Sequence, residues 1–166
     1  MSWNVPMEDL ARIIDHAIDN GYTIAWGGDV SEDGFTRNGI AVLADEKKVQ
    51  DLDGSEMAKW LKLYSDKKKE KLQKLGVNVP ELVPSQEQRQ NEFDNWQLTD
   101  DHGMQIYGKA KDQNGREYYM VKNSWGETGE YKGVWYMTKN FIVAKTMDFL
   151  INKNALPKDI RKKLGL

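Results

Sequence analysis

The chain has 166 residues, of which 39% are hydrophobic and 30% are charged; this excludes an intrinsically disordered chain and predicts one folded domain over residues 1–166. Its 24 basic and 26 acidic residues leave a net charge of -2, so the charge balance calls for neither a nucleic acid nor an anionic membrane as partner. Cysteine is absent, which excludes disulfides, thiolate metal sites and thiol catalysis by residues of this chain.

The first segment, residues 6–20, is predicted to form an amphipathic helix. Its apolar residues recur at the three- and four-residue spacing of one helix face. Pro6 suits a first helical position, and Gly21 suits the residue after a helix end. Residues 22–26 then carry β-type side chains and lead into Gly27-Gly28, which predicts a strand that runs into a turn.

A short strand and two helices are predicted next. Residues 39–43 form the strand, and residues 55–75 form a helix with one apolar stripe. The lysine-rich run at residues 67–71 is interpreted as a solvated face of that helix. Ser85 followed by Gln88 is a capping-box pattern, which predicts the start of a second, shorter helix. The apolar stripe consists of Met57, Trp60, Leu61 and Tyr64.

From His102 onward the pattern is mainly that of β-strands. A strong turn signal at residues 112–115 lies between two of them, and residues 157–164 predict a small terminal helix. The layout is therefore α+β, with helices first and then a mostly antiparallel sheet. The predicted strands are residues 104–107, 117–122, 133–137 and 146–151, with a helical turn at 141–145.

His102 and Asn123 lie on opposite arms of the hairpin predicted around that turn. A modest register shift or β-bulge would bring their side chains together. An asparagine carbonyl can then accept the ring N–H of a histidine and fix its tautomer, so that the ring can take and return a proton beside a cysteine thiolate. Trp125 could shield that hydrogen bond from water. From spacing alone the alternative stays open that His102 is a surface or capping residue and Asn123 a turn residue.

Three other motifs carry less weight. Residues 29–34 imitate the opening of an EF-hand loop, but the twelfth position is Ile40, where a glutamate is needed. His16 has no second metal ligand near it in the sequence and is interpreted as a solvated residue. Ser124 directly follows Asn123, a place that favours a structural role over that of a nucleophile. We therefore expect no metal site and no cofactor.

Two segments resemble the papain superfamily of cysteine peptidases. Residues 101–104 read Asp-His-Gly-Met and residues 121–126 read Val-Lys-Asn-Ser-Trp-Gly, similar to the histidine and asparagine segments of that family, in the same order. The resemblance covers nearly the whole chain and is weakest at residues 45–80, which we expect to be a more variable helical insertion. Further segments resemble one branch, bleomycin hydrolase and aminopeptidase C: residues 5–10, 21–32 and 93–103.

The resemblance implies a fold and a set of roles. The fold is a papain-like β-rich lobe, an antiparallel sheet or partial barrel with flanking helices, without the helical lobe that carries the cysteine and the oxyanion-hole glutamine. His102 would be the general acid and base, Asn123 would orient its ring, and Trp125 would shield the pair. The cleft between the lobes binds extended peptide in this family. The residues expected to line it here are Trp125, Gly103, Trp26, Gly28 and Asp29.

The nucleophile is missing from this pattern. The cysteine of such peptidases precedes the histidine by roughly 130 residues or more, and counting back from His102 passes Met1. We therefore expect the His/Asn-bearing half of a cysteine (amino)peptidase, which hydrolyses peptide bonds but is inactive alone. The alternative is a non-catalytic peptide-binding or regulatory module derived from that lobe. The C-terminal arm that restricts this branch to aminopeptidase activity is also expected to be absent, because the chain ends at Leu166.

The expected partners are a Cys-bearing helical lobe, from the same gene or a separate chain, and a peptide substrate. No nucleic acid or membrane is expected, and a homo-oligomer stays open. No apolar run reaches the length of a bilayer span, and residues 1–6 lack the features of a signal peptide. We expect a cytoplasmic location, unless the chain is a piece of a secreted precursor whose signal lies elsewhere.

Overall fold

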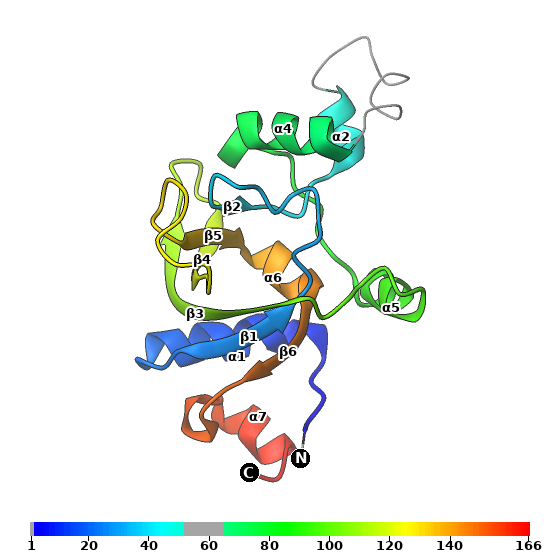
Figure 1. Cartoon of the computed structure of the whole chain (residues 1–166). Coiled ribbons are helices and arrows are strands. Elements are labelled where there is room, and N and C mark those ends of the chain that lie inside the picture. Colours follow the sequence, from blue (N-terminus) through cyan, green and yellow to red (C-terminus); the bar gives the residue numbers. More distant parts are fainter. Residues whose placement is uncertain (1, 52–64) are drawn as a thin grey trace.

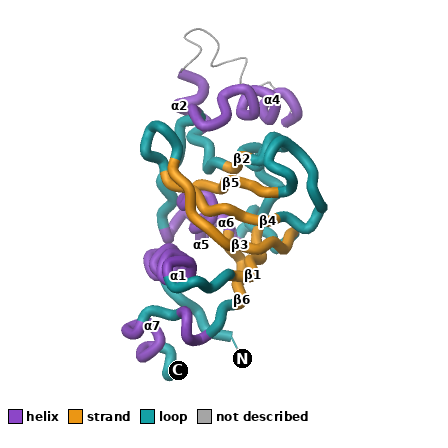
Figure 2. The backbone as a smooth tube through the Cα atoms, turned by 90° about the vertical axis from the view of Figure 1, so that its left-hand side faces the viewer, coloured by secondary structure: helices purple, strands orange, loops and turns teal. Residues whose placement is uncertain are grey.

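The computed structural model describes residues 2–51 and 65–166, and within them the strands form a six-stranded sheet in the order β2-β5-β4-β3-β1-β6 (Figure 1). Figure 2 shows the strands following one another in that order, from β2 at the top to β6 at the bottom. The strands are β1 (Ile24–Gly28), β2 (Ile40–Ala41), β3 (His102–Lys111), β4 (Glu117–Lys122), β5 (Val134–Thr138) and β6 (Thr146–Leu150).

Helices flank the sheet and extend beyond both of its edges (Figure 1). α1 and α6 contact each other and pack on the central strands. α2 and α4 lie beyond the β2 edge, and α7 lies beyond β6 (Figure 1). The helices are α1 (Met7–Asp19), α2 (Glu46–Asp51), α4 (Ser65–Leu75), α5 (Gln86–Asp94), α6 (Lys139–Lys145) and α7 (Lys158–Lys163), with 3₁₀ turns at Gly76–Asn78 and Lys153–Ala155.

The predicted α+β class is confirmed. All strand pairs of the sheet are antiparallel except β2–β5, which is parallel. The sheet does not close into a barrel, since β2 and β6 lie at its two ends. The β-rich lobe expected from the resemblance is therefore an open, twisted sheet with helices against it.

The first helix forms where its apolar spacing predicts. α1 buries one stripe of side chains, and the chain leaves it at Gly21, whose φ of 78° is the left-handed conformation that glycine adopts without strain. Pro6 is the residue before the helix rather than its first residue. Its fixed φ still suits this place, and its missing N–H leaves nothing unpaired. The buried apolar residues of α1 are Leu10, Ile13, Ile14 and Ala17.

The main core lies between α1, α6 and one face of the sheet. Ile24, Ile106 and Val121 come from three different strands and are fully buried in it. Phe141 and Ile142 reach the same core from α6. On the other face, Tyr136 of β5 packs against a second, smaller cluster, while Gly27 and Ala25 of β1 leave that face nearly bare of side chains.

Several predicted boundaries differ from the observed ones. Gly27-Gly28 forms the end of β1 instead of a turn after it, and the strand at residues 39–43 shortens to two residues. Residues 65–75 confirm the second part of the helix predicted at 55–75. Its first part, with Met57, Trp60, Leu61 and Tyr64, lies outside the described residues.

α5 begins as the capping pattern predicts. The side-chain oxygen of Ser85 accepts a hydrogen bond from the backbone N–H of Gln88 at 3.0 Å. α5 buries none of its residues, so polar contacts hold it to the rest of the fold. The buried ammonium of Lys145 pairs with Glu92 of α5 at 3.0 Å and with Glu32. Although burial alone would lower it, these carboxylates raise the pKa of Lys145.

Candidate active site

A β-bulge in the β3–β4 hairpin decides which face of the sheet Asn123 occupies. Near the turn Gly108 pairs with Met120, but beyond the bulge Ile106 pairs with Val121. Continued past the last pair, this register sets Asn123 opposite Met104. Without the bulge, Asn123 would lie opposite the residue next to Met104. Since side chains alternate between faces, the bulge brings Asn123 to the face of His102. The β-bulge that the positions of His102 and Asn123 in the hairpin required is therefore present.

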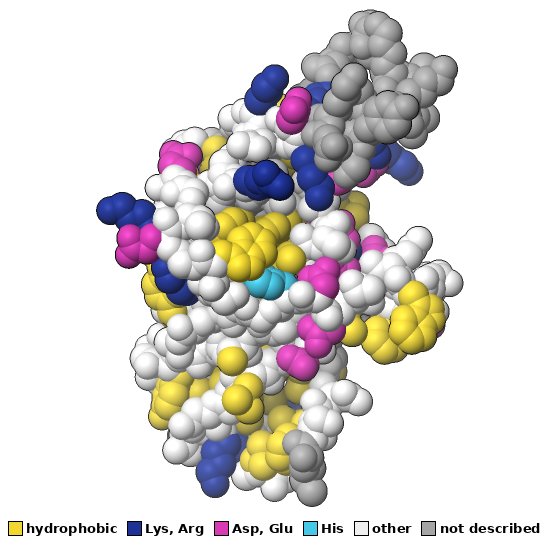
Figure 3. Space-filling view, in the orientation of Figure 1, with side chains coloured by type: hydrophobic (Ala, Val, Ile, Leu, Met, Phe, Trp, Pro, Cys, Tyr) yellow, Lys and Arg dark blue, Asp and Glu magenta, His cyan; other side chains and the backbone are white. Residues whose placement is uncertain are grey.

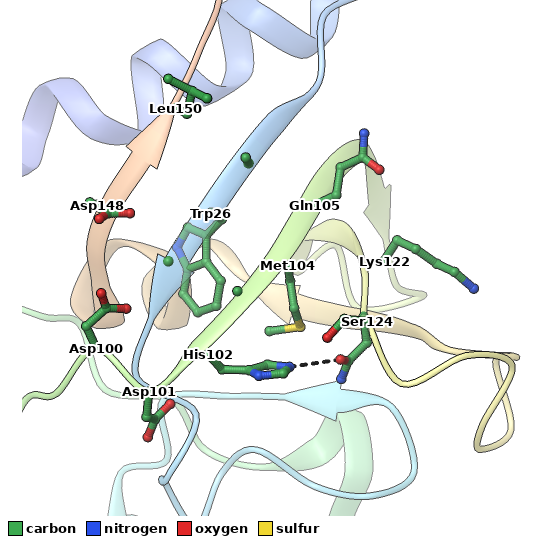
Figure 4. A pocket seen from close by; sticks show the side chains of 14 residues that line it. Trp26, Asp100, Asp101, His102, Met104, Gln105, Lys122, Ser124, Asp148 and Leu150 are labelled. Atoms are coloured by element: carbon green, nitrogen blue, oxygen red, sulfur yellow. Dashed lines mark hydrogen bonds between the residues drawn. The ribbon is translucent and has the colours of Figure 1, made fainter.

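The two side chains meet in a hydrogen bond. Nε2 of His102 lies 2.9 Å from Oδ1 of Asn123 (Figure 4). Because an amide oxygen can only accept, the proton of this bond belongs to Nε2. Nδ1 is then the nitrogen that can take up or release a proton, and no described group hydrogen-bonds to it.

Asn123 is held rigidly. Its side chain is buried, with 3% of the residue exposed, and its backbone N–H donates to the carbonyl of Gly133 at 2.9 Å. Oδ1 is engaged with His102, while Nδ2 has no partner among the described residues. An amide fixed in this way can orient an imidazole without exchanging protons itself.

Trp125 covers the pair from one side. Its ring lies 4.8 Å from the ring of His102, tilted by 40°. It is held in turn by edge-to-face contacts with Phe35 at 6.3 Å and Trp135 at 5.7 Å. The residue stays 52% exposed, so one surface shields the imidazole and the other faces solvent. In Figure 3 a histidine lies at the surface between hydrophobic side chains and a group of acidic ones.

An open groove of ≈ 690 Å³ runs beside His102. Its floor is β1, where Gly27 and Ala25 present little or no side chain. Gly27 pairs with Gly103 on one side and Asp148 on the other, and Ala25 pairs likewise with Gln105 and Leu150. The small residues of β1 thus form a trough between the strands that flank it. The groove is also lined by Trp26, Asp100, Asp101, Met104, Lys122, Asn123 and Ser124.

Three of the five residues expected to bind peptide lie at the groove or against His102. Trp26 and Gly103 line the groove, and Trp125 lies against His102. Gly28 and Asp29 are not among the residues that line it, although Gly28 pairs with His102 across β1 and β3. A side chain at Gly28 would overlap the indole of Trp26.

Asp29 has a structural role. It is fully buried, and one carboxylate oxygen accepts from the backbone N–H and hydroxyl of Ser31 at 2.9 and 2.7 Å. The other oxygen accepts from the backbone N–H of Thr99 at 3.1 Å. The physical reason is that Gly27-Gly28 continues the strand, so the chain enters the interior here instead of turning along the groove.

Sequence reasoning missed the far wall of the groove. Asp148 and Leu150 come from β6, which pairs with β1 although more than a hundred residues separate them. No local pattern signals that pairing. Asp100 could have been found, because it directly precedes the Asp-His-Gly segment of the candidate site.

The motifs set aside in the sequence have structural contacts. His16 is not simply solvated, because its Nδ1 lies 2.8 Å from the carbonyl of Ala155. Ser124 lines the groove but follows the asparagine that orients the imidazole. Over residues 2–51 and 65–166, no group of three or more His, Cys, Asp or Glu side chains is placed to hold a metal ion. No helix in this same part is long and apolar enough to cross a membrane.

Comparison with known proteins gives three findings. The model of the peptidase C1-like family matches residues 1–165. Cathepsin L1 of Drosophila melanogaster is 45% identical over 40 residues, 24% of this chain and 11% of that protein. The crystal structure of PepW from Lactobacillus rhamnosis HN001 aligns with a TM-score of 0.53 and 18% identity, over 93% of this chain and 29% of that one. At 18% identity the likeness to PepW concerns the fold alone. The chain spans less than a third of cathepsin L1 and less than a third of PepW.

Proposed function

Because the chain belongs to the peptidase C1-like family, we propose that it is the His/Asn-bearing half of a papain-like cysteine peptidase, of the aminopeptidase C or bleomycin hydrolase type. The observation that carries the proposal is the 2.9 Å bond between His102 and the buried amide of Asn123. The chain has no cysteine, so a helical lobe from the same gene or from another chain supplies the thiol. The chain alone is then inactive.

His102 performs the proton transfers in this proposal. Its Nδ1 accepts the proton of the thiol, and the resulting imidazolium stabilises the thiolate beside it. The thiolate attacks the peptide carbonyl, and Nδ1–H then returns the proton to the departing amine. In the second half Nδ1 takes a proton from the water that attacks the acyl-enzyme, and gives it to the departing thiolate.

Asn123 keeps the ring in register through these steps. Oδ1 accepts from Nε2–H in both the neutral and the protonated ring, so the bond persists while the charge changes. Trp125 covers this bond against water, which strengthens it. The trough along β1 gives an extended peptide a place to lie beside the imidazole.

Complementation tests the proposal. The chain is mixed with the separately produced Cys-bearing lobe of an aminopeptidase C-type peptidase, and hydrolysis of an aminoacyl fluorogenic substrate is followed. We expect turnover from the mixture and none from either part. His102→Ala abolishes it, whereas His16→Ala, which removes the chain's other histidine, retains it. Demonstrated association of the two parts without turnover would contradict the proposal.

A second candidate is a non-catalytic peptide-binding or regulatory module. The absence of cysteine favours it together with the open trough, which needs no catalysis to hold a peptide. This candidate predicts that peptide affinity is unchanged in His102→Ala and that a Cys-bearing lobe adds no turnover. The first proposal, a peptidase half, predicts instead that a Cys-bearing lobe does add turnover.

A further inference from the structure

We propose that the trough selects peptides that carry a positively charged group, which is held over Gly27 between the carboxylates of Asp148 and Asp100. The inference rests on the proposed function only in taking the trough as the place where peptide lies. It adds a substrate class, cationic peptides, and two residues that determine specificity.

The two carboxylates converge over Gly27. A Cβ atom built on Gly27 would lie 2.6 Å from Oδ1 of Asp148 and 3.3 Å from Oδ1 of Asp100. Asp148 comes from β6, and Asp100 comes from the segment before β3. Figure 4 shows both on one side of the groove, with the His102–Asn123 pair on the other. A side chain at position 27 would collide with the carboxylate of Asp148, so glycine is what lets the two acids come together over β1.

The position over Gly27 lies close to the candidate catalytic group. Gly27 pairs with Gly103, the residue after His102, and Asp148 pairs with Gly27 on the next strand. Neighbouring strands are about 4.8 Å apart, and an extended peptide advances about 3.3 Å per residue. A group over Gly27 therefore belongs to a residue within one or two positions of the bond that would be cleaved.

The charge of the two acids is available to a ligand. Within the described part of the chain, the side-chain carboxylates of Asp148 and Asp100 make no hydrogen bond and no ion pair. Asp101 differs, because its Oδ1 accepts from the backbone N–H of Val30 at 3.0 Å. Lys122 is the cation on the groove wall, but its Nζ donates to the carbonyl of Lys132. A cation over Gly27 would thus meet two negative groups without displacing a partner.

The next row of the trough has an apolar wall on the side of β6. Ala25 and Leu150 pair there, and Leu150 is 76% exposed. The groove therefore offers negative charge near His102 and an apolar wall two residues further along the strands. A peptide with a cationic residue followed or preceded by an apolar one matches both rows.

Two sources can supply the cation: the free amino terminus of a peptide or a lysine side chain. Four peptides of equal length with a C-terminal fluorophore separate them: neutral and N-acetylated; neutral with a free amino terminus; acetylated with one lysine; and acetylated with one glutamate. Binding to the whole chain is measured by fluorescence anisotropy at low ionic strength, where exposed charges are least screened.

We expect at least one cationic peptide to bind about 3- to 10-fold more tightly than the neutral peptide, the scale of one or two exposed ion pairs. Asp100→Asn with Asp148→Asn removes this preference and leaves the neutral peptide unaffected. The matched control, Glu87→Gln with Glu130→Gln, removes two exposed charges outside the groove and keeps the preference. Gly27→Ala also weakens the binding of the cationic peptide, because the added methyl group crowds Asp148.

The outcomes separate the two proposals. Peptide binding without any charge preference, or an equal loss for neutral and cationic peptides in the double variant, overturns the specificity and leaves the proposed function standing. If no peptide of the set binds, the trough by itself is not a site for cationic peptides and the specificity is overturned, whereas the proposed function is decided by the complementation test. A preference for the free amino terminus assigns the cation to an exopeptidase-type substrate, and a preference for lysine assigns it to a side chain.

Discussion

Asn123, with its buried side-chain amide, is the residue on which the candidate site depends most. Its Oδ1 accepts a single hydrogen bond, from the His102 ring, and almost none of the residue is exposed to water. A surface asparagine in a turn, the alternative that the sequence left open, would be solvated and unconstrained. The observed burial instead matches the requirement that the orienting group be more rigid than the group it orients.

Replacing Asn123 by alanine is expected to change the tautomer of His102. In the wild-type chain the acceptor at Asn123 selects the form with the proton on Nε2. Without it the neutral ring becomes a mixture of both tautomers. Long-range ¹H–¹⁵N NMR of the imidazole nitrogens measures the two populations directly. The same Nε2–H form in wild type and variant would show that Asn123 does not set the tautomer.

Replacing Trp125 by alanine is expected to lower the free energy of unfolding by about 1–2 kcal/mol, because its contacts with Phe35 and Trp135 are lost while half of its surface was already exposed. Trp96→Ala is the matched control. Trp96 is 86% exposed, so its loss changes the free energy by less than about 0.5 kcal/mol. Urea titrations of both variants test this; equal effects would mean that Trp125 does not pack as described.

At the scale of elements, the local patterns predict well and the pairing between distant strands does not follow from them. The spacing of α1, the cap of α5 and the 112–115 hairpin depend on residues a few positions apart, so the sequence displays them. The insertion of β1 between β3 and β6 depends on how three distant segments pack together. That arrangement makes the trough, and for this reason Asp148 and Leu150 were not foreseeable.

The same limit explains why Gly28 and Asp29 are not among the residues that line the groove. Gly27-Gly28 carries the composition of a turn, and glycine does favour turns when no neighbour demands an extended chain. Here β3 and β6 pair with both sides of this dipeptide, and their hydrogen bonds override the local preference. Asp29 is then drawn into the interior, away from the groove. The His–Asn–Trp part was predictable because its members lie within one hairpin and the segment after it.

Glu81 connects the segment after α4 with the far ends of β4 and β5. It lies 3.9 Å from Arg116, and its Oε1 is buried without a partner in the described part of the chain. Burial raises the pKa of Glu81 above its ordinary value of 4.5, although Thr138, Arg116 and Asn140 partly oppose this. The folded state therefore binds a proton here more tightly than the unfolded state does.

The sign of the pH effect follows from linkage. Stabilisation by this proton is complete below the ordinary pKa of about 4.5 and is lost as the pH rises through the raised pKa of the folded state. Glu81→Gln keeps the group neutral, so its advantage over wild type should grow between about pH 4 and neutrality. Urea titrations across this range measure the difference. A difference that is constant, or that shrinks as the pH rises, would contradict the assigned direction.

At the scale of the whole molecule, the chain presents an open groove beside an oriented imidazole. His102 and Asn123 lie beside the trough along β1 (Figure 4), and the half-exposed Trp125 packs against His102. The chain spans 29% of PepW. What it contains is enough to orient an imidazole, but its sequence offers no thiol.

The central claim is that His102, oriented by Asn123, activates a thiol from another polypeptide segment. The rate of iodoacetamide alkylation of the Cys-bearing lobe, with and without this chain, tests it most directly, because the chain has no cysteine that could react. At about pH 6 we expect wild type to raise the rate ~10-fold or more, since an adjacent imidazolium converts thiol to thiolate. His102→Ala should give no acceleration, and Asn123→Ala only a reduced one. Equal rates with wild type and His102→Ala, while both bind the lobe, would contradict the claim.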